Sequence, residues 1–258
     1  AYPLGVRDAT GYHGFFEVYM PLDERNKALD RAKSLNTVEA VAARHRALNA
    51  MHMQPLVAHV QRLRDIAPAG VPDFDPSDGG IYAECLFLLE APGRKAVGSG
   101  FVSRNNPDET ARNFFAANAE AGLPRSRTVT WNAIPWYIGD GQRIRAAGGS
   151  DLRAAEQHLA QLLVLLPRLR VVVLVGRKAQ RYSKAVTILA PSVLVLVCPH
   201  PSPLSFNGRP ERRAEMQACL SQVVATLGKS FEASSNPSIE ATSSGKLRLP
   251  TAAHGVNR

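Results

Sequence analysis

Four short apolar runs constrain the fold of this chain more strongly than any other feature. They occupy residues 85–89 (CLFLL), 127–133 (RTVTWNA), 171–175 (VVVLV) and 193–198 (VLVLVC). Three of the runs are nearly continuous rather than alternating, which is typical of strands that are covered on both faces. The runs therefore predict a four-stranded sheet that lies inside the protein.

Helical patterns lie between these runs and after the last of them. They occupy residues 107–122, 151–166, 177–189 and 210–228. Strands that alternate with helices favour right-handed crossovers and a mostly parallel sheet. We therefore predict a three-layer α/β/α fold with helices on both faces of the sheet.

The remaining segments differ from the strand and helix patterns in composition. Residues 20–66 carry charged residues throughout and apolar residues at helical spacing, with Asn36 as a plausible cap within the segment. We expect one domain over residues 1–228, made of this N-terminal helical part and a core at 84–228. The Ser-rich segment 229–258 is poor in large apolar residues and is expected to be a flexible tail.

Composition excludes some classes of protein. The 258 residues are 45% hydrophobic, enough for a sizeable core, yet no apolar run approaches the ~18 residues that span a membrane. The N-terminal stretch does not pair a basic region with an apolar one, so we expect no secretory signal and a cytoplasmic, bacterial-type protein. The three widely spaced cysteines fit neither a disulfide framework nor a metal site, and we expect reduced thiols and no metal.

The net charge of +9 has two readings. A basic surface attracts a polyanion such as nucleic acid. Abundant Arg and Ala can equally reflect a GC-rich genome, so charge alone does not decide between them.

The loops that follow the four runs carry the polar residues. In an open parallel sheet, ligands bind outside the carboxyl ends of the strands. Glu90, Asn132 and His200 each follow or end one of the runs, so we expect them to meet at one edge of the sheet. Pro199, Pro201 and Pro203 would hold the last loop in one conformation, as a preorganised site requires. Each of these residues also has an ordinary structural role, as a cap or a turn residue.

Four motifs in these loops resemble those of the uracil-DNA glycosylase superfamily. They are EAPGR at 90–94, GFV at 100–102, NA at 132–133 and HPSPLS at 200–205. The first resembles the water-activating motif of family 4, and the last resembles the second signature of family 1. The resemblance covers roughly residues 84–228, and it implies the fold of that superfamily with added N-terminal helices.

The resemblance implies a role for each residue of the base pocket. Phe101 would stack on a uracil that has left the DNA stack, and Asn132 would pair with the polar edge of the base. His200 would donate a hydrogen bond to the leaving base, and Glu90 would activate water. Two further pocket positions are implied, at Ala91 and Gly93.

The resemblance also implies a DNA-binding surface. Ser202 and Ser205 would hold phosphates, and Leu204 would fill the gap that the extruded base leaves. Lys178 and Arg209 are candidates for further phosphate contacts. The implied protein is a monomeric uracil-DNA glycosylase that needs no cofactor, acts on single- or double-stranded DNA and leaves an abasic site.

The sequence departs from the family at three points. Leu89 stands in place of the usual first glycine of the water-activating motif, and Gly93 stands where family 1 enzymes have a tyrosine that excludes thymine. Three scattered cysteines cannot form the four-cysteine cluster of families 4 and 5. Alternatives therefore stay open: a glycosylase for hypoxanthine or xanthine, a non-catalytic binder of uracil-containing or single-stranded DNA, and an unrelated doubly wound nucleotide-binding enzyme.

Overall fold

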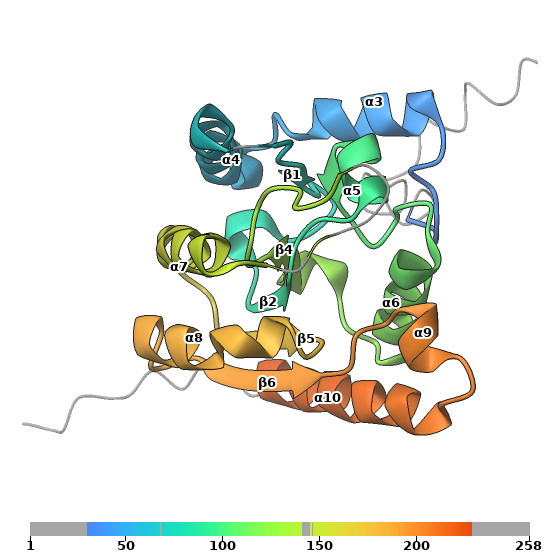
Figure 1. Cartoon of the computed structure of the whole chain (residues 1–258). Helices are drawn as coiled ribbons and strands as arrows, with labels where there is room; N and C mark the ends of the chain where they lie inside the picture. Colours follow the sequence, from blue (N-terminus) through green and yellow to red (C-terminus); the bar gives the residue numbers. More distant parts are fainter. Residues whose placement is uncertain (1–29, 68, 141–144, 146, 229–258) are drawn as a thin grey trace, which may run out of the picture. The chain divides into compact units, whose positions relative to one another are not determined.

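A parallel four-stranded sheet forms the centre of the computed structural model of this chain (Figure 1). Its strands are β2 (Cys85–Leu89), β4 (Thr128–Asn132), β5 (Val171–Val175) and β6 (Leu194–Cys198). Their order is β4-β2-β5-β6, and every neighbouring pair is parallel. The chain leaves β2 for β4 on one side and then crosses to β5 on the other, so the order reverses at β2.

The structure describes residues 30–67, 69–140, 145 and 147–228. These residues belong to one compact unit, which ends at residue 228. Part of the expected helical segment at 20–29 and the expected tail at 229–258 lie outside the described residues. No helix in the described ranges is both long and apolar enough to cross a membrane.

Helices surround the sheet. They are α3 (Val38–Ala47), α4 (Gln54–Ile66), α5 (Arg94–Ser99), α6 (Glu109–Glu120), α7 (Gly149–Val164), α8 (Ser183–Leu189), α9 (Pro203–Phe206) and α10 (Pro210–Gly228). Short 3₁₀ turns occupy η2 (Met51–Met53), η3 (Gly80–Tyr82), η4 (Arg125–Arg127) and η5 (Ala179–Tyr182).

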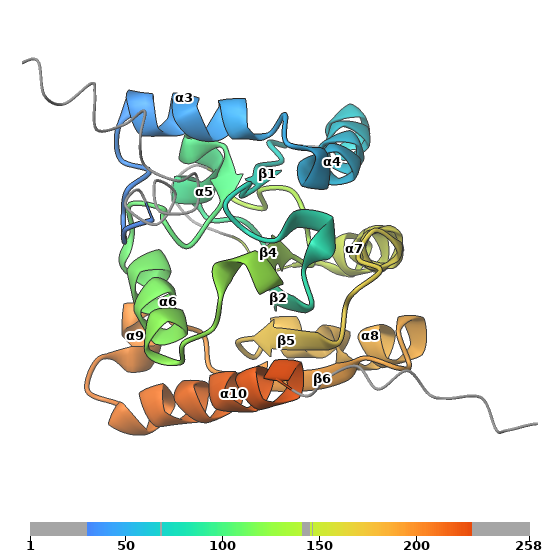
Figure 2. The same ribbon diagram turned by 180° about the vertical axis from the view of Figure 1, so that it is seen from behind.

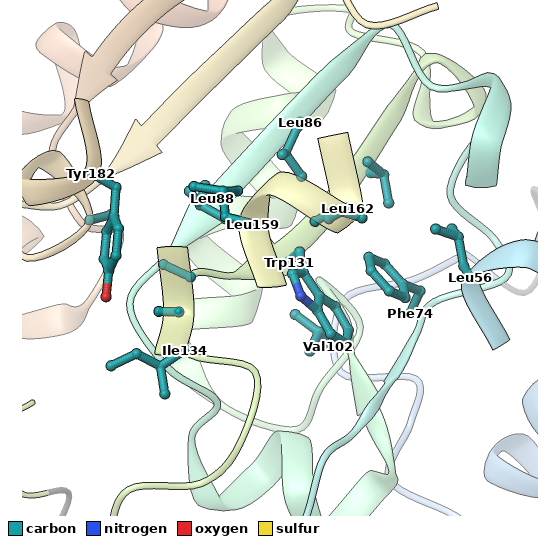
Figure 3. Close-up of a cluster of buried hydrophobic side chains, with 14 of the residues drawn as sticks. Leu56, Phe74, Leu86, Leu88, Val102, Trp131, Ile134, Leu159, Leu162 and Tyr182 are labelled. Atoms are coloured by element: carbon teal, nitrogen blue, oxygen red, sulfur yellow. The ribbon is translucent and has the colours of Figure 1, made fainter. Parts of the chain in front are cut away.

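The core consists of two clusters, one on each face of the sheet. Leu86 and Leu88 of β2 join the cluster that α4, α7 and α8 cover, which Figure 3 shows in part. Cys85 and Phe87 of the same strand join the other cluster, under α6 and α10. Figures 1 and 2 show α6 and α10 along the side of the sheet away from α7. Residues of one strand thus alternate between two apolar layers, which confirms the predicted three-layer fold.

Strand β4 differs from its neighbours because one of its faces is polar. Val129 and Trp131 enter the first cluster, where Trp131 stacks on Phe74 with ring centroids 3.6 Å apart (Figure 3). Thr128, Thr130 and Asn132 are also buried, and they project from the opposite face because side chains alternate along a strand. The edge strand β4 therefore carries a row of buried polar side chains that ends at the carboxyl edge of the sheet.

Two local details differ from the sequence prediction. A second, two-stranded parallel sheet pairs β1 (Asp73–Phe74) with β3 (Phe101–Val102), and strands of two residues are too short to leave a pattern. The cap of α3 is Thr37 and not Asn36, since the Thr37 hydroxyl accepts a hydrogen bond from the Ala40 amide at 3.2 Å.

A buried ionic network joins the N-terminal segment to the sheet. Arg125 pairs with Asp30, Asp75 and Asp78, and Arg44 also pairs with Asp75. Burial alone would raise the pKa of Asp75, but Arg125 and Arg44 hold that pKa well below its usual range. The carboxylate is therefore ionised, and it depends on both arginines.

We predict that Arg125→Ala destabilises the protein by about 3–5 kcal/mol, because it leaves buried carboxylates without their partner. The matched control is Arg212→Ala, which removes an exposed pair with Glu215 and should cost less than about 1 kcal/mol. Urea unfolding followed by circular dichroism measures both. Equal losses in the two variants would show that the network contributes no more than a surface pair.

Candidate active site

A cavity of about 760 Å³ opens at the carboxyl ends of β2 and β4. Its walls come from the loop after β2, from the start of α6 and from the loop after β6. This is the point where the strand order reverses, and it is where open α/β sheets bind their ligands. Asn132 and His200 both line the cavity, as do Ala91 and Gly93.

Asn132 lies at the buried end of the polar face of β4. It is the last residue of the strand, in register with Leu89 of β2, and it is only 4% exposed. Thr130, two residues earlier on the same face, lines the cavity as well. The sheet therefore fixes the backbone that carries the Asn132 amide.

His200 is held by close backbone packing with the loop after β5. Gly176 has a φ of +86°, and a Cβ at that position would lie 2.9 Å from the Cβ of His200. The Gly176 amide also donates to the Cys198 carbonyl at 2.8 Å. Only glycine adopts this conformation readily and leaves room for the histidine.

The electrostatics of His200 favour its neutral form. Burial lowers the pKa of His200 below its usual value, although the negative charges of Glu90 and Asp108 oppose the shift. A neutral imidazole can still donate one N–H hydrogen bond. His200 can therefore act as a hydrogen-bond donor at neutral pH without carrying a charge.

The loop after β6 is fixed at both of its sides. Asn113 of α6 donates from its side-chain amide to the Pro201 carbonyl at 2.9 Å. After Ser202 the chain enters α9, with the amides of Ser205 and Phe206 donating to the Ser202 carbonyl. Figures 1 and 2 both show α9 beside α6.

A second hollow, of about 750 Å³, adjoins the cavity and shares His200 with it. We call it the basic groove. Its lining includes Arg177, Ser202, Leu204, Ser205, Arg209 and Arg212. Leu204 is 85% exposed, in the short helix α9. Hydroxyl groups, guanidinium groups and one projecting apolar side chain thus lie together.

Phe101 does not line the cavity. It is fully buried and packs against His45 of α3, with ring centroids 4.5 Å apart. Val102 lines the cavity instead, because consecutive residues of β3 point to opposite faces. Phe101 could stack on a base in this cavity only by leaving the core. Among the described residues that line the cavity, the phenylalanine is Phe114, on α6.

Glu90 and Lys178 pair with each other, and neither lines the cavity or the basic groove. The Lys178 ammonium lies 2.9 Å from the Glu90 carboxylate, which is 17% exposed. The expected roles of Glu90 in water activation and of Lys178 in DNA binding thus compete with this ion pair. The carboxylate in the described lining of the cavity is that of Asp108.

Sequence reasoning missed Asp108, Phe114, Arg104 and Thr130, which also line the cavity. Asp108 could be read only as a cap of the helix at 107–122, and Phe114 only as one of its apolar residues. Their place at the cavity depends on how α6 packs against the sheet. No motif in the sequence carries that information.

The described residues provide no group of three or more His, Cys, Asp or Glu side chains that could hold a metal ion. All three cysteines are buried as free thiols. Burial of the Cys85 thiol raises its pKa far above the usual value, so it is protonated and unreactive.

An imidazole and a side-chain amide thus line one cavity at the point where the strand order reverses, beside a groove lined by arginines. The family model described as "Uracil DNA glycosylase superfamily" matches residues 76–224, which is more than half of the chain. The chain belongs to that superfamily. It is therefore a DNA glycosylase, an enzyme that cleaves the bond between a base and its deoxyribose.

Two further comparisons were made, one with solved structures and one with curated protein sequences. A crystal structure of wild-type Pedobacter heparinus SMUG2 superposes with a TM-score of 0.47 at 11% sequence identity, covering 67% of this chain and 99% of that one. No curated protein sequence matches the chain.

We predict that Gly176→Ala slows base release by tenfold or more, since a displacement of about 1 Å at a catalytic group can cost about 100-fold. The added methyl group must push against His200. Gly122→Ala is the matched control, because Gly122 also has a positive φ of 64° but nothing lies within 4 Å of its Cβ position. Single-turnover rates measure both. If both variants lose stability but neither loses rate, Gly176 does not position His200.

Proposed function

We propose that this protein hydrolyses the N-glycosidic bond of uracil in DNA and leaves an abasic site. The observation that carries the proposal is the position of the Asn132 amide, which is buried in a cavity that it shares with His200. A side-chain amide both donates and accepts, so it can match the adjacent N–H and C=O groups of uracil. It matches the N and NH₂ edge of cytosine only with its own orientation reversed.

In the proposed reaction, His200 stabilises the departing base. Cleavage leaves negative charge on a carbonyl oxygen of uracil, and a neutral imidazole N–H can donate to that oxygen. The pKa of His200 is lowered by burial, which supports the neutral donor. Phe114 contributes to the same wall, with its ring packed against Phe87 and beneath the Arg104 guanidinium.

The basic groove supports DNA as the polymer that carries the base. Its arginines and the hydroxyls of Ser202 and Ser205 are suited to phosphates, which Arg and Ser side chains commonly contact. Leu204 projects where an apolar residue could fill the space of the extruded base. We expect a monomer, since the cavity and the groove are built from one chain, and a cytoplasmic site of action.

A second candidate substrate is another deaminated base, hypoxanthine or xanthine. A Cβ at Gly93 would meet nothing within 4 Å, so the cavity is open where a larger side chain could narrow it. The open wall leaves room for a purine. Hypoxanthine and xanthine also present adjacent N–H and C=O groups, so the Asn132 amide fits all three bases. Uracil remains the first proposal because the motifs at 90–94 and 200–205 resemble those of uracil-DNA glycosylases.

The test is base release from strands that contain uracil, thymine, hypoxanthine or xanthine, without added metal, with abasic sites detected by alkaline cleavage. We expect release from the uracil strand and none from the thymine strand. Asn132→Ala and His200→Ala should each reduce the single-turnover rate by about 100-fold or more, with DNA affinity nearly unchanged. Asn49→Ala removes an exposed amide far from the site in sequence and should retain the full rate.

Each other outcome of this test has a distinct meaning. Tight binding of uracil-containing strands without abasic sites would identify a non-catalytic binder. Faster release of hypoxanthine or xanthine than of uracil would favour the second candidate. Full activity of both Asn132→Ala and His200→Ala would remove the site assignment.

We predict that Gly93→Tyr narrows the cavity and changes its selectivity. The new ring would occupy the open wall and should reduce the rate for purine bases by at least about tenfold more than the rate for uracil, because a pocket rejects oversized ligands by steric clash. The ratio of single-turnover rates on uracil and hypoxanthine strands measures the effect. Gly93→Ala serves as the control, and an unchanged ratio in Gly93→Tyr would show that this wall does not limit base size.

A further inference from the structure

We propose that Asp108 is the catalytic carboxylate that holds the attacking water, a role for which the sequence motif indicates Glu90. The inference rests on the proposed function, because it assigns a residue to that hydrolysis. It is carried by the positions of the two carboxylates relative to the cavity.

The two carboxylates differ in what they face. Asp108 lines the cavity together with Asn132 and His200. Glu90 does not belong to the lining that the described residues form, although its neighbours Ala91 and Gly93 do. A group that positions water against a sugar in the mouth of this cavity must reach the cavity, and Asp108 does.

Glu90 is held in its present direction by both its backbone and its side chain. The Glu90 carbonyl accepts a hydrogen bond from the Ile134 amide at 2.8 Å, and the preceding Leu89 carbonyl accepts from Ala133 at 2.8 Å. The carboxylate then meets the Lys178 ammonium at 2.9 Å. The ion pair therefore offsets part of its negative charge before any substrate binds.

Asp108 has no such cationic partner among the described residues. The adjacent Glu109 pairs with Lys33 and Arg112. Asp108 instead uses one carboxylate oxygen, Oδ1, to accept from the Ala111 amide at 2.9 Å, as the cap of α6. This bond fixes the side-chain rotamer and leaves the second oxygen for another donor.

The turn that leads to Asp108 is rigid. The Asn106 side chain donates to the Phe101 carbonyl at 2.9 Å and accepts from the Ser99 hydroxyl at 2.6 Å. The Asp108 amide in turn donates to the Asn106 carbonyl at 2.8 Å. A preorganised carboxylate loses little freedom when it binds water, which favours catalysis.

Asp108 and His200 belong to elements that are tied together. Asn113, on the helix that Asp108 caps, donates to the Pro201 carbonyl beside His200 at 2.9 Å. Glu90, and after it Asp108, raises the pKa of His200 against the larger effect of burial. Both carboxylates are thus near the imidazole, but Asp108 approaches it from the cavity wall.

The reaction balances with water as the second substrate. The bond between C1′ and the base nitrogen breaks, and its electron pair leaves with the base, which accepts a hydrogen bond from His200. The water oxygen bonds to C1′ while Asp108 accepts the water proton. That proton then returns to solvent, and the base takes up one proton on release. The negative carboxylate also favours the cationic sugar that forms in between.

The experiment compares carboxylate variants in the full chain, by single-turnover release from a single-stranded uracil oligonucleotide and by affinity for the same strand. We expect Asp108→Asn and Asp108→Ser to slow release by about 100-fold or more, since a positioned general base contributes about 10²–10⁴-fold. Their DNA affinity should stay within about threefold. The single-turnover rate of Glu90→Gln should be at least about tenfold higher than that of Asp108→Asn.

The choice of variants separates chemistry from folding. Asn and Ser are both good helix caps, so the two Asp108 variants should keep the melting temperature within a few degrees. Glu109→Gln, at the next position and outside the cavity lining, should retain the full rate. A loss of rate with an unchanged melting temperature and unchanged DNA affinity supports the assignment.

Four results would overturn the inference. Near-normal release by Asp108→Asn, or a larger loss in Glu90→Gln than in Asp108→Asn, contradicts it while leaving the proposed function intact. If both Asp108→Ser and Asp108→Asn lower the melting temperature and lose rate in step with it, Asp108 acts as a helix cap alone. Absence of base release by the wild-type protein from every strand of the panel would overturn both proposals together.

Discussion

The hydrogen bonding of β2 to β4 on one side and β5 on the other is the constraint on which the rest of this structure depends. Because both pairings are parallel, the carboxyl ends of three strands meet at one edge. Leu89 pairs with Asn132 at that edge, and β5 leads directly into Gly176, which packs on His200. Amide and imidazole therefore come from positions 68 residues apart in the numbering and still face one cavity.

The buried ionic network also contacts residues that line the cavity. Ser103 donates to Asp75, and Arg104 donates to Thr128 at 2.6 Å from a side chain that is almost wholly buried. Both Ser103 and Arg104 also line the cavity. The charges that join the N-terminal segment to the sheet thus also hold part of the cavity wall, so stability and site geometry depend on the same contacts.

The sequence was sufficient to predict the strands of the sheet, but it did not predict the direction in which several side chains point. The runs at 85–89 and 171–175 match β2 and β5, because strands buried on both faces must be apolar throughout. Phe101 and Glu90 lie in motif positions, yet the alternation along β3 and the pairing with Lys178 turn them away from the cavity. Asp108 reaches it through the packing of a helix, which local sequence does not encode.

His200 contributes to the walls of both hollows, the cavity proposed for the base and the basic groove proposed for the phosphate chain. The stiff segment that carries it also carries the protruding Leu204. Distortion of a bound strand would therefore be transmitted to the imidazole through a few rigid peptide units. A single nucleotide without a flanking strand would occupy the cavity but not the basic groove. The turnover rate would then depend on the length of the DNA strand.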